Sequence, residues 1–235
     1  WIDYSVLEQC LREDLEGCAH RRMAVMKPLK LIIDNYPEGQ SEELVAENHP
    51  QKPEMGSRSI TFSRELWIEE TDFAEVPPKG FRRLTVPADG SPAKPVRLRY
   101  GYVIVPTSFE KDAEGRVTVV HANYLPETKS GTEGSMSVKT KATIHWLDAQ
   151  TARAAEFRVY DRLFNEPNPE AGEGSFLDHL TPNSKTILQG YVEPCTADAA
   201  NEERFQFERT GYFVADRKDH APEHPVFNLS VGLRD

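Results

Sequence analysis

The chain has 235 residues, of which 38% are hydrophobic and 28% charged, and its formal net charge is −10 at pH 7. This length allows one large hydrophobic core or two smaller ones. The negative charge argues against broad, nonspecific nucleic-acid binding but leaves room for a focused basic patch. No apolar run reaches the length of a membrane span, and the three cysteines indicate no disulfide framework, so we expect a cytoplasmic protein.

The first segment of the chain is predicted to be helical. It starts at Trp1 without the pattern of a signal peptide, which suggests a fragment or a processed piece. Ser5 and Glu8 fit a capping box, and Gly17 marks the C-terminal end of the helix. One apolar stripe, at spacings of three or four, consists of Leu7, Leu11, Leu15 and Cys18.

After about residue 30 the helical period gives way to short strand-like runs separated by turns. One such turn is "KDAEGR", where Gly115 suits a hairpin. Many short strands, with 17 prolines and 14 glycines, predict an all-β sandwich or barrel, and the lack of a βαβ rhythm excludes a parallel nucleotide-binding sheet. We expect long exposed loops at 38–58, 125–140 and 165–175, the second being the most mobile.

Enzymatic signatures are missing from the sequence. It contains no P-loop, no dinucleotide-binding glycine pattern and no G-x-S-x-G motif. Cys10, Cys18 and His20 match no common zinc spacing, so we expect no metal site there. Asp178 and His179 lack a matching nucleophile and are interpreted as a short helical turn between strands.

Positive charge is concentrated in residues 79–99, which hold six Lys or Arg against one Asp. Within this segment Arg97 and Arg99 alternate with apolar residues, so a strand would point both to one side. Two interpretations fit, a solvated face of a half-buried strand or a set of guanidinium donors for bases and phosphates. Gln206, between two phenylalanines in "RFQFER", allows the same two interpretations. The pattern alone favours the solvated face in both cases.

Longer strings change this balance. The strings "LREDLEGCAHRRMAVMKPLKLIIDNYPEG", "VRLRYGYVI", "ERFQFERTGYF" and "PVFNLSVGLRD" resemble the C-terminal, anticodon-binding half of the glutaminyl-tRNA synthetases, and the resemblance runs from the first helix to the last residue. It implies a mainly β fold with two β-barrels, similar to a barrel of a ribosomal protein, preceded by a short helical segment. The implied division is 1–20 for the end of a helical connecting subdomain, 21–75 and 165–235 for a proximal barrel, and 76–164 for a distal barrel.

The resemblance also implies which residues contact RNA. The middle anticodon base, a uridine, would be read by Arg21 and Gln206, with Arg209 supporting the same region. The third base, a guanine, would be read by Arg83, next to Arg82, which stands where many relatives have Lys.

Arg97 and Arg99 match positions near the first base, a C or a modified U. By this interpretation the arginine-bearing strand faces RNA.

The implied partner is the anticodon loop of glutamine tRNA, bound by a monomer, with no DNA or membrane partner. The HIGH and KMSKS signatures of class I synthetases are absent from the sequence. We therefore expect no catalytic residue, metal or cofactor in this chain, whereas ATP with magnesium would serve the parent ligase.

Three alternatives stay open. The first is the anticodon-binding half of an archaeal or eukaryotic type of glutamyl-tRNA synthetase, against which "VRLR" and "FQFERTGYF" favour glutamine. The second is a ribosomal-RNA-binding barrel protein, against which the sequence pI near 5.3 and the two-barrel length count. The third is a protein-interaction module without a role in RNA binding.

Overall fold

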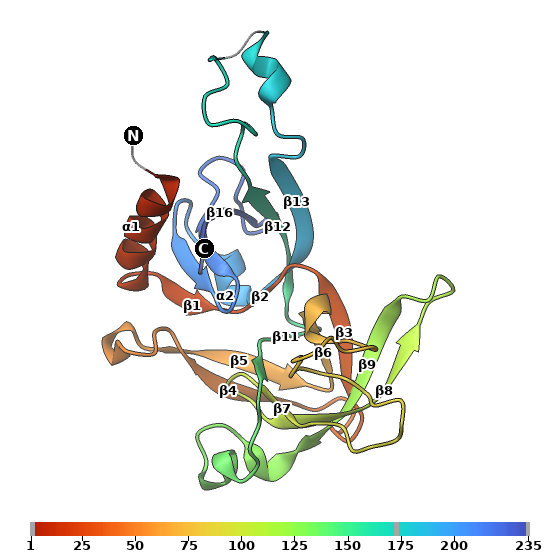
Figure 1. Cartoon of the computed structure of the whole chain (residues 1–235). Coiled ribbons are helices and arrows are strands. Elements are labelled where there is room, and N and C mark those ends of the chain that lie inside the picture. The colour runs from red at the N-terminus through yellow and green to blue at the C-terminus, as the bar shows by residue number, and fades with distance from the viewer. Residues whose placement is uncertain (1–2, 172–173, 234–235) are drawn as a thin grey trace.

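Two seven-stranded sheets, one above the other in Figure 1, make up most of the structure. The structure is a computed structural model that describes residues 3–171 and 174–233. The predicted mainly β fold with barrel-like sheets and a short N-terminal helix is confirmed. We call the two sheets, with the segments that join their strands, the upper and the lower barrel.

The upper barrel has the strand order β1-β14-β15-β16-β12-β13-β2. Its edge strands β1 and β2 are consecutive in the chain, which brings the two edges of the sheet close together. Its strands are β1 (His20–Arg22), β2 (Ala24–Val25), β12 (Arg153–Tyr160), β13 (Lys185–Val192), β14 (Arg204–Phe207), β15 (Gly211–Ala215) and β16 (Val226–Gly232).

The lower barrel has the order β10-β7-β8-β9-β3-β6-β11, and its edge strands are again consecutive in the chain. Its strands are β3 (Pro28–Ile33), β6 (Glu65–Glu69), β7 (Val96–Leu98), β8 (Val103–Lys111), β9 (Val117–Leu125), β10 (Thr143–Ile144) and β11 (Leu147–Asp148). The predicted hairpin turn between β8 and β9 is confirmed, because Gly115 takes the left-handed backbone there with φ of 81°.

The expected loop 38–58 is instead a two-stranded ribbon of β4 (Ser41–Glu47) and β5 (Ser57–Ser63). The ribbon packs its inner face, which includes Leu44 and Phe62, into the core of the lower barrel. The sequence pattern was misleading here because the outer face of β4 is acidic.

The sheets divide the chain differently from the expected ranges. Strands β3 and β6, expected in the proximal barrel, pair with strands of the lower barrel, as the parallel pairing of β3 with β9 shows. Strand β12, expected in the distal barrel, pairs with β13 and β16 in the upper one. The lower barrel therefore occupies one continuous stretch of chain, from β3 to β11, between β2 and β12.

Helix α1 (Tyr4–Glu16) begins earlier than predicted, because Asp3 caps it by accepting the amide hydrogen of Ser5. The predicted capping box of Ser5 and Glu8 is therefore wrong, while Gly17 ends the helix as expected. Only part of the apolar stripe is covered. Leu15 is buried against the upper barrel, whereas Leu7 is 51% exposed.

The remaining helical elements are short and lie in the connections between strands. They are α2 (Pro194–Ala197), η1 (Pro53–Met55), η2 (Glu70–Asp72), η3 (Pro126–Thr128), η4 (Glu133–Met136) and η5 (Phe176–His179). The predicted helical turn at Asp178 and His179 is thus confirmed as η5. Among the described residues, no helix is long and apolar enough to cross a membrane.

Specific contacts join the two barrels. Trp67 of β6 and Tyr191 of β13 stack with their ring centroids 5.0 Å apart and their planes 6° from parallel. The Glu69 carboxylate accepts the amide hydrogens of Met26 and Lys27, which fixes the crossover from β2 to β3. The barrels are therefore held in a defined relative position by packing and by hydrogen bonds.

Candidate nucleic-acid interface

Arg21, Gln206 and Tyr212 form a row across three neighbouring strands. Arg21 of β1 is the register partner of Gln206 in β14, and Gln206 is the partner of Tyr212 in β15. Directly paired residues share a face of the sheet. In β14 this face is the outer one, because Phe205 and Phe207 point into the aromatic core of the upper barrel. The structure thus brings together the two residues implied for the middle base.

Glu16, the last residue of α1, closes this row. Its carboxylate accepts hydrogen bonds from the Arg21 guanidinium at 2.6 Å and from the Tyr212 hydroxyl at 2.5 Å. The Gln206 amide nitrogen donates a longer bond of 3.5 Å to it. We call these four residues the helix-end cluster.

Burial raises the pKa of Glu16, but hydrogen bonding from Tyr212 and the charge of Arg21 outweigh it, so the pKa lies below its usual range. Burial and the adjacent Glu16 raise the pKa of the Tyr212 hydroxyl. At neutral pH the cluster therefore contains an ionised carboxylate, a guanidinium and a protonated phenol. Arg21, whose side chain is only 4% exposed, has its charge matched in place.

A second group of charges lies where the two barrels meet. Arg209, after β14, donates two parallel hydrogen bonds to the Asp72 carboxylate, of 2.8 and 2.6 Å. Asp72 ends η2 in the lower barrel and is fully buried. Arg83 approaches the same carboxylate at 3.4 Å and donates to the Thr71 carbonyl at 3.0 Å. One buried carboxylate thus gathers two of the implied RNA-binding arginines.

Glu208 does the same for Arg99. The Arg99 guanidinium pairs with the buried Glu208 carboxylate, which also accepts the Tyr100 hydroxyl at 2.6 Å. Arg99 lies over the Tyr100 ring, 5.0 Å from its centroid. Burial and Glu208 raise the pKa of Tyr100 to about 12. Asp72, Arg83, Arg99, Tyr100, Glu208 and Arg209 are called the junction cluster below.

Backbone strain coincides with the junction cluster. Tyr100 and Arg209 both have left-handed backbone, with φ of 60° and 67°. Such conformations cost free energy in non-glycine residues and persist only where the surroundings fix them. Arg209 also meets the buried His145. Because a guanidinium has no acceptor, Arg209 donates this bond, of 3.2 Å, to Nδ1 of His145, and Nε2 of the same ring lies 3.6 Å from the Glu69 carboxylate.

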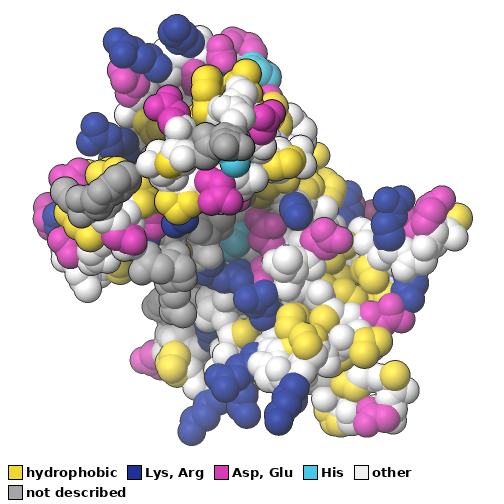
Figure 2. All heavy atoms as spheres, turned by 45° about the horizontal axis from the view of Figure 1, so that its top comes forward, with side chains coloured by type: hydrophobic (Ala, Val, Ile, Leu, Met, Phe, Trp, Pro, Cys, Tyr) yellow, Lys and Arg dark blue, Asp and Glu magenta, His cyan; other side chains and the backbone are white. Residues whose placement is uncertain are grey.

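Open space lies above this cluster. A groove with a volume of about 620 Å³ is lined by Arg83, Arg99, Glu208, Arg209, Thr210, Gly232 and Leu233. Figure 2 shows Lys and Arg side chains gathered where the two barrels meet and on the lower barrel. Arg83 and Arg99 keep 41% and 34% of their side chains exposed, so their outer edges can reach a ligand in the groove.

Arg97 does not belong to this groove. It donates to the carbonyl of Thr128 at 3.1 Å, to the Ser130 hydroxyl at 3.2 Å, and to the carbonyl of Ser135. The segment 125–140, expected to be the most mobile, is therefore tied to β7 through the Arg97 guanidinium, and Ser130 and Lys129 add bonds to the Gly101 carbonyl and the Glu42 carboxylate. Arg82, by contrast, is exposed on the irregular segment that precedes β7.

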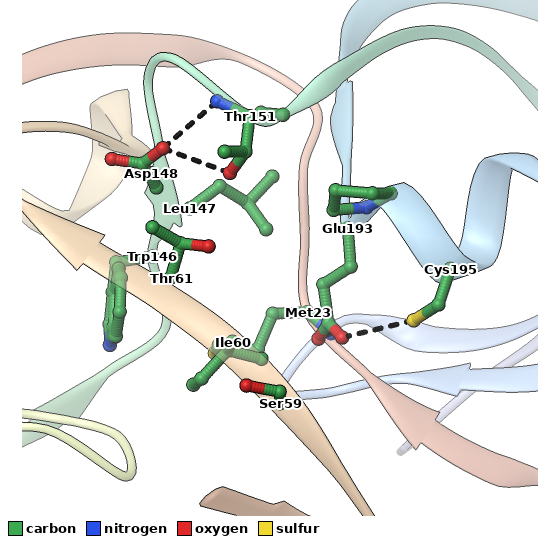
Figure 3. Close-up of a pocket in the computed structure, with 12 residues that line it drawn as sticks. Met23, Ser59, Ile60, Thr61, Trp146, Leu147, Asp148, Thr151, Glu193 and Cys195 are labelled. Atoms are coloured by element: carbon green, nitrogen blue, oxygen red, sulfur yellow. Dashed lines mark hydrogen bonds between the residues drawn. The ribbon is translucent and has the colours of Figure 1, made fainter. Parts of the chain in front are cut away.

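A smaller pocket, of about 160 Å³, lies in the seam between the barrels (Figure 3). Its polar groups are already engaged. Glu193 accepts from the Met23 amide at 2.5 Å and pairs with Arg58, while Asp148 accepts twice from Thr151 at 2.9 Å. We therefore assign this pocket to the joint between the barrels. Within residues 3–171 and 174–233, no group of three or more His, Cys, Asp or Glu side chains is suited to hold a metal ion. Cys10, Cys18 and His20 lie in this range and form no such group.

Sequence reasoning missed the carboxylates that organise the site. Glu16, Asp72 and Glu208 each hold one or two of the implied RNA-binding residues. Glu208 alternates with Gln206 in the sequence, which was the one available signal. Asp72 gave none, because its bidentate partner Arg209 is 137 positions away in the sequence.

Comparison with known proteins gives a consistent result. Two family models, both described as "tRNA synthetases class I (E and Q), anti-codon binding domain", match residues 19–125 and 143–216. The chain is 60% identical over 235 residues to the glutamine–tRNA ligase of Cupriavidus necator. Identity is 52% to that of Polynucleobacter asymbioticus and 49% to that of Nitrosomonas europaea. All of this chain is covered, but it spans only 39%, 40% and 41% of these relatives.

Proposed function

Since the chain belongs to the anticodon-binding domains of the class I (E and Q) tRNA synthetases, we propose that it is the anticodon-recognition part of a glutamine–tRNA ligase. Its partner would be the anticodon loop of glutamine tRNA. The relatives named above, each called a glutamine–tRNA ligase, favour glutamine over glutamate. A monomer in the cytoplasm is part of this proposal.

The observation that carries the proposal is the pairing of Arg21 with Gln206 on the outer face of the upper barrel, where Arg21 is buried beside the end of α1 and Gln206 is half-buried. Uracil presents an N–H flanked by two carbonyl oxygens, so it needs one acceptor and one or more donors. Gln206 can supply the acceptor and Arg21 the donors. Sequence-specific RNA recognition targets loop bases that can be splayed out onto such a surface.

The junction cluster suits the other two bases. Arg83 has donors left beyond those used by Asp72 and Thr71, and a guanidinium matches the two acceptors on one edge of guanine. Arg99 lies in the same groove and would serve the first base. Arg209, held by Asp72, would shape the groove floor between them.

The remaining two arginines have different proposed roles. Exposed Arg82 would contact phosphate, which sets register without reading sequence. Arg97 has its donors directed at its own loop, so we assign it to holding segment 126–136 in place. The ATP with magnesium used by a whole ligase is assigned to no residue of this chain.

Binding to two anticodon stem-loop RNAs tests the proposal. The triplet CUG belongs to glutamine and CUC to glutamate, so the pair isolates the third base. We expect a preference for CUG, and affinity that falls with salt by a slope of about −0.7 per neutralised phosphate. Equal binding with a salt slope would mean backbone contacts only, and a preference for CUC would indicate the glutamate-specific alternative. The measurement is made at a low and a high salt concentration. Absence of binding at both would favour a protein-interaction module.

A further inference from the structure

Glu16 has no RNA-binding role in the proposed function, yet it touches every member of the row that would read the middle base. Its carboxylate accepts from Arg21 and Tyr212 at 2.6 and 2.5 Å and from Gln206 at 3.5 Å. Three donors on three strands therefore converge on one carboxylate from α1.

Glu16 is itself held in place from behind. Its backbone carbonyl lies 2.8 Å from Nε2 of His49, and the next carbonyl, that of Gly17, accepts from Lys52. His49 and Lys52 lie at the tip of the β4–β5 ribbon, which packs on the lower barrel. The end of α1 is thus held by contacts with both barrels, and the Glu16 side chain is held in place with it.

We propose that Glu16 is a positioning residue that sets the preference for uridine at the middle base; this rests on the proposed function. The tie from the Gln206 amide nitrogen to Glu16 leaves the amide oxygen of Gln206 directed away from the carboxylate. That oxygen accepts the N3 hydrogen of uracil. Cytosine has no hydrogen on N3 and presents an amino group in place of one carbonyl, so it meets the reversed pattern.

The same carboxylate fixes Arg21. The Arg21 side chain is only 4% exposed, so its guanidinium needs a negative charge beside it. Glu16, whose side chain is half-exposed, supplies that charge. Without Glu16 the guanidinium loses its ion pair and keeps the weak bond of 3.5 Å that it already donates to the Ala19 carbonyl. Both donors and acceptors for the middle base then lose their fixed directions.

The experiment compares Glu16→Ala and Glu16→Gln with the unaltered chain on three anticodon stem-loops, CUG, CCG and CUC. Asp14→Asn is the matched control, because Asp14 is exposed on the last turn of the same helix and loses the same charge. Thermal unfolding midpoints of all variants accompany the binding data. If Glu16→Ala lowers the unfolding midpoint so far that the variant is not folded in the binding assay, Glu16→Gln, which keeps an oxygen acceptor, is used to test the role of Glu16.

We expect Glu16→Ala to reduce the preference for CUG over CCG about tenfold, the scale of one directed base contact. The preference for CUG over CUC should stay, since Arg83 is untouched. Glu16→Gln should retain part of the middle-base preference, and Asp14→Asn all of it.

An unchanged CUG-to-CCG ratio in both Glu16 variants, or equal loss at the middle and third bases, would overturn the role of Glu16. So would a uniform gain in affinity, which would make Glu16 a competitor of RNA. If the unaltered chain shows no middle-base preference, the proposed readout by Arg21 and Gln206 fails first and takes this inference with it.

Discussion

Arg209 and Asp72 join the two barrels through a pair of hydrogen bonds, 2.8 and 2.6 Å long, between residues that are 137 positions apart in the sequence. The carboxylate is fully buried, while the guanidinium keeps 27% of its surface exposed. Such a pair orders both partners, and breaking it strands a buried charge.

Replacing Arg209 with Ala should therefore destabilise the fold by about 3 kcal/mol, the lower end of the range for a broken buried pair, because Arg83 still approaches Asp72. Urea unfolding measures this as a lower midpoint at a constant slope. The control is Arg217→Ala, whose 3.8 Å pair with Glu202 is solvent-exposed and should change stability by less than about 0.5 kcal/mol. Equal effects in the two variants would contradict the buried-pair interpretation.

Arg83→Ala should lower the preference for CUG over CUC stem-loops about tenfold, because one guanidinium facing guanine is lost. Its sequence neighbour Arg82 serves as a control of equal charge. Arg82→Ala should weaken binding to both RNAs by the same factor and reduce the salt slope by about 0.7. The assignment is refuted if the two variants behave alike.

Arg97→Lys should loosen segment 126–136, because an ammonium cannot meet the several acceptors that the guanidinium spans. Limited trypsin digestion reports this as faster cleavage after Lys129. Arg116→Lys is the comparison, since Arg116 pairs with Asp112 and Glu114 of the β8–β9 turn and is 76% exposed. Cleavage at the same rate in both would show that Arg97 does not hold the loop.

His121 should make stability depend on pH. Its imidazole hydrogen-bonds Asp34 at 2.8 Å and Glu110 at 3.1 Å, and these bonds, Asp34 foremost, raise the pKa of His121 against the opposing effect of burial. A raised pKa contributes stability below the unfolded value near 6.5, and the contribution disappears as the pH rises past the folded value.

His121→Gln should thus lower the free energy of unfolding by about 0.5 kcal/mol at pH 5.5 and by less at pH 8.5. The exposed His224 gives the control, His224→Gln, which should show no such difference. A larger loss at the higher pH would reverse the sign and refute the assignment.

Gly190 tests the closure of the upper barrel. A Cβ atom at this position would lie 2.0 Å from the Val25 carbonyl oxygen, where β13 meets the edge strand β2. Gly190→Ala should cost at least about 3 kcal/mol, because backbone and not a flexible side chain must shift. Gly101→Ala, where a Cβ atom would have no neighbour nearer than 3.5 Å, should cost less than about 1.5 kcal/mol. Thermal unfolding of both variants measures the difference.

Local features of the fold could be predicted from the sequence, because their causes are local. Gly115 set a hairpin turn, and the alternation of Phe205 and Phe207 with polar residues set the inward and outward faces of β14. The partner of each strand could not be predicted in this way. The apolar pattern of β3 does not show that it lies beside β9 and not beside β2, so the expected barrel boundaries differ from the sheets.

The candidate site follows the same division. Arg21 and Gln206 were singled out through the family resemblance, and the sheet register places them side by side. Arg97 and Arg99 were expected to act together, but what each one contacts is decided by distant carbonyls and carboxylates. Asp72 and Glu208 reach their partners Arg209 and Arg99 only where the two barrels pack together. The sequence around each carboxylate does not predict that packing.

The placement of the lower barrel as one continuous stretch between β2 and β12 has a consequence for synthesis on the ribosome. Every strand of the lower sheet has been made once residue 148 has been added, so this barrel can close while the rest of the chain is still being translated. The first two strands of the upper barrel must instead wait for β14 and β13, their partners. A fragment that ends just before β12, released from the ribosome, should therefore contain a protease-resistant lower barrel with β1 and β2 still unpaired.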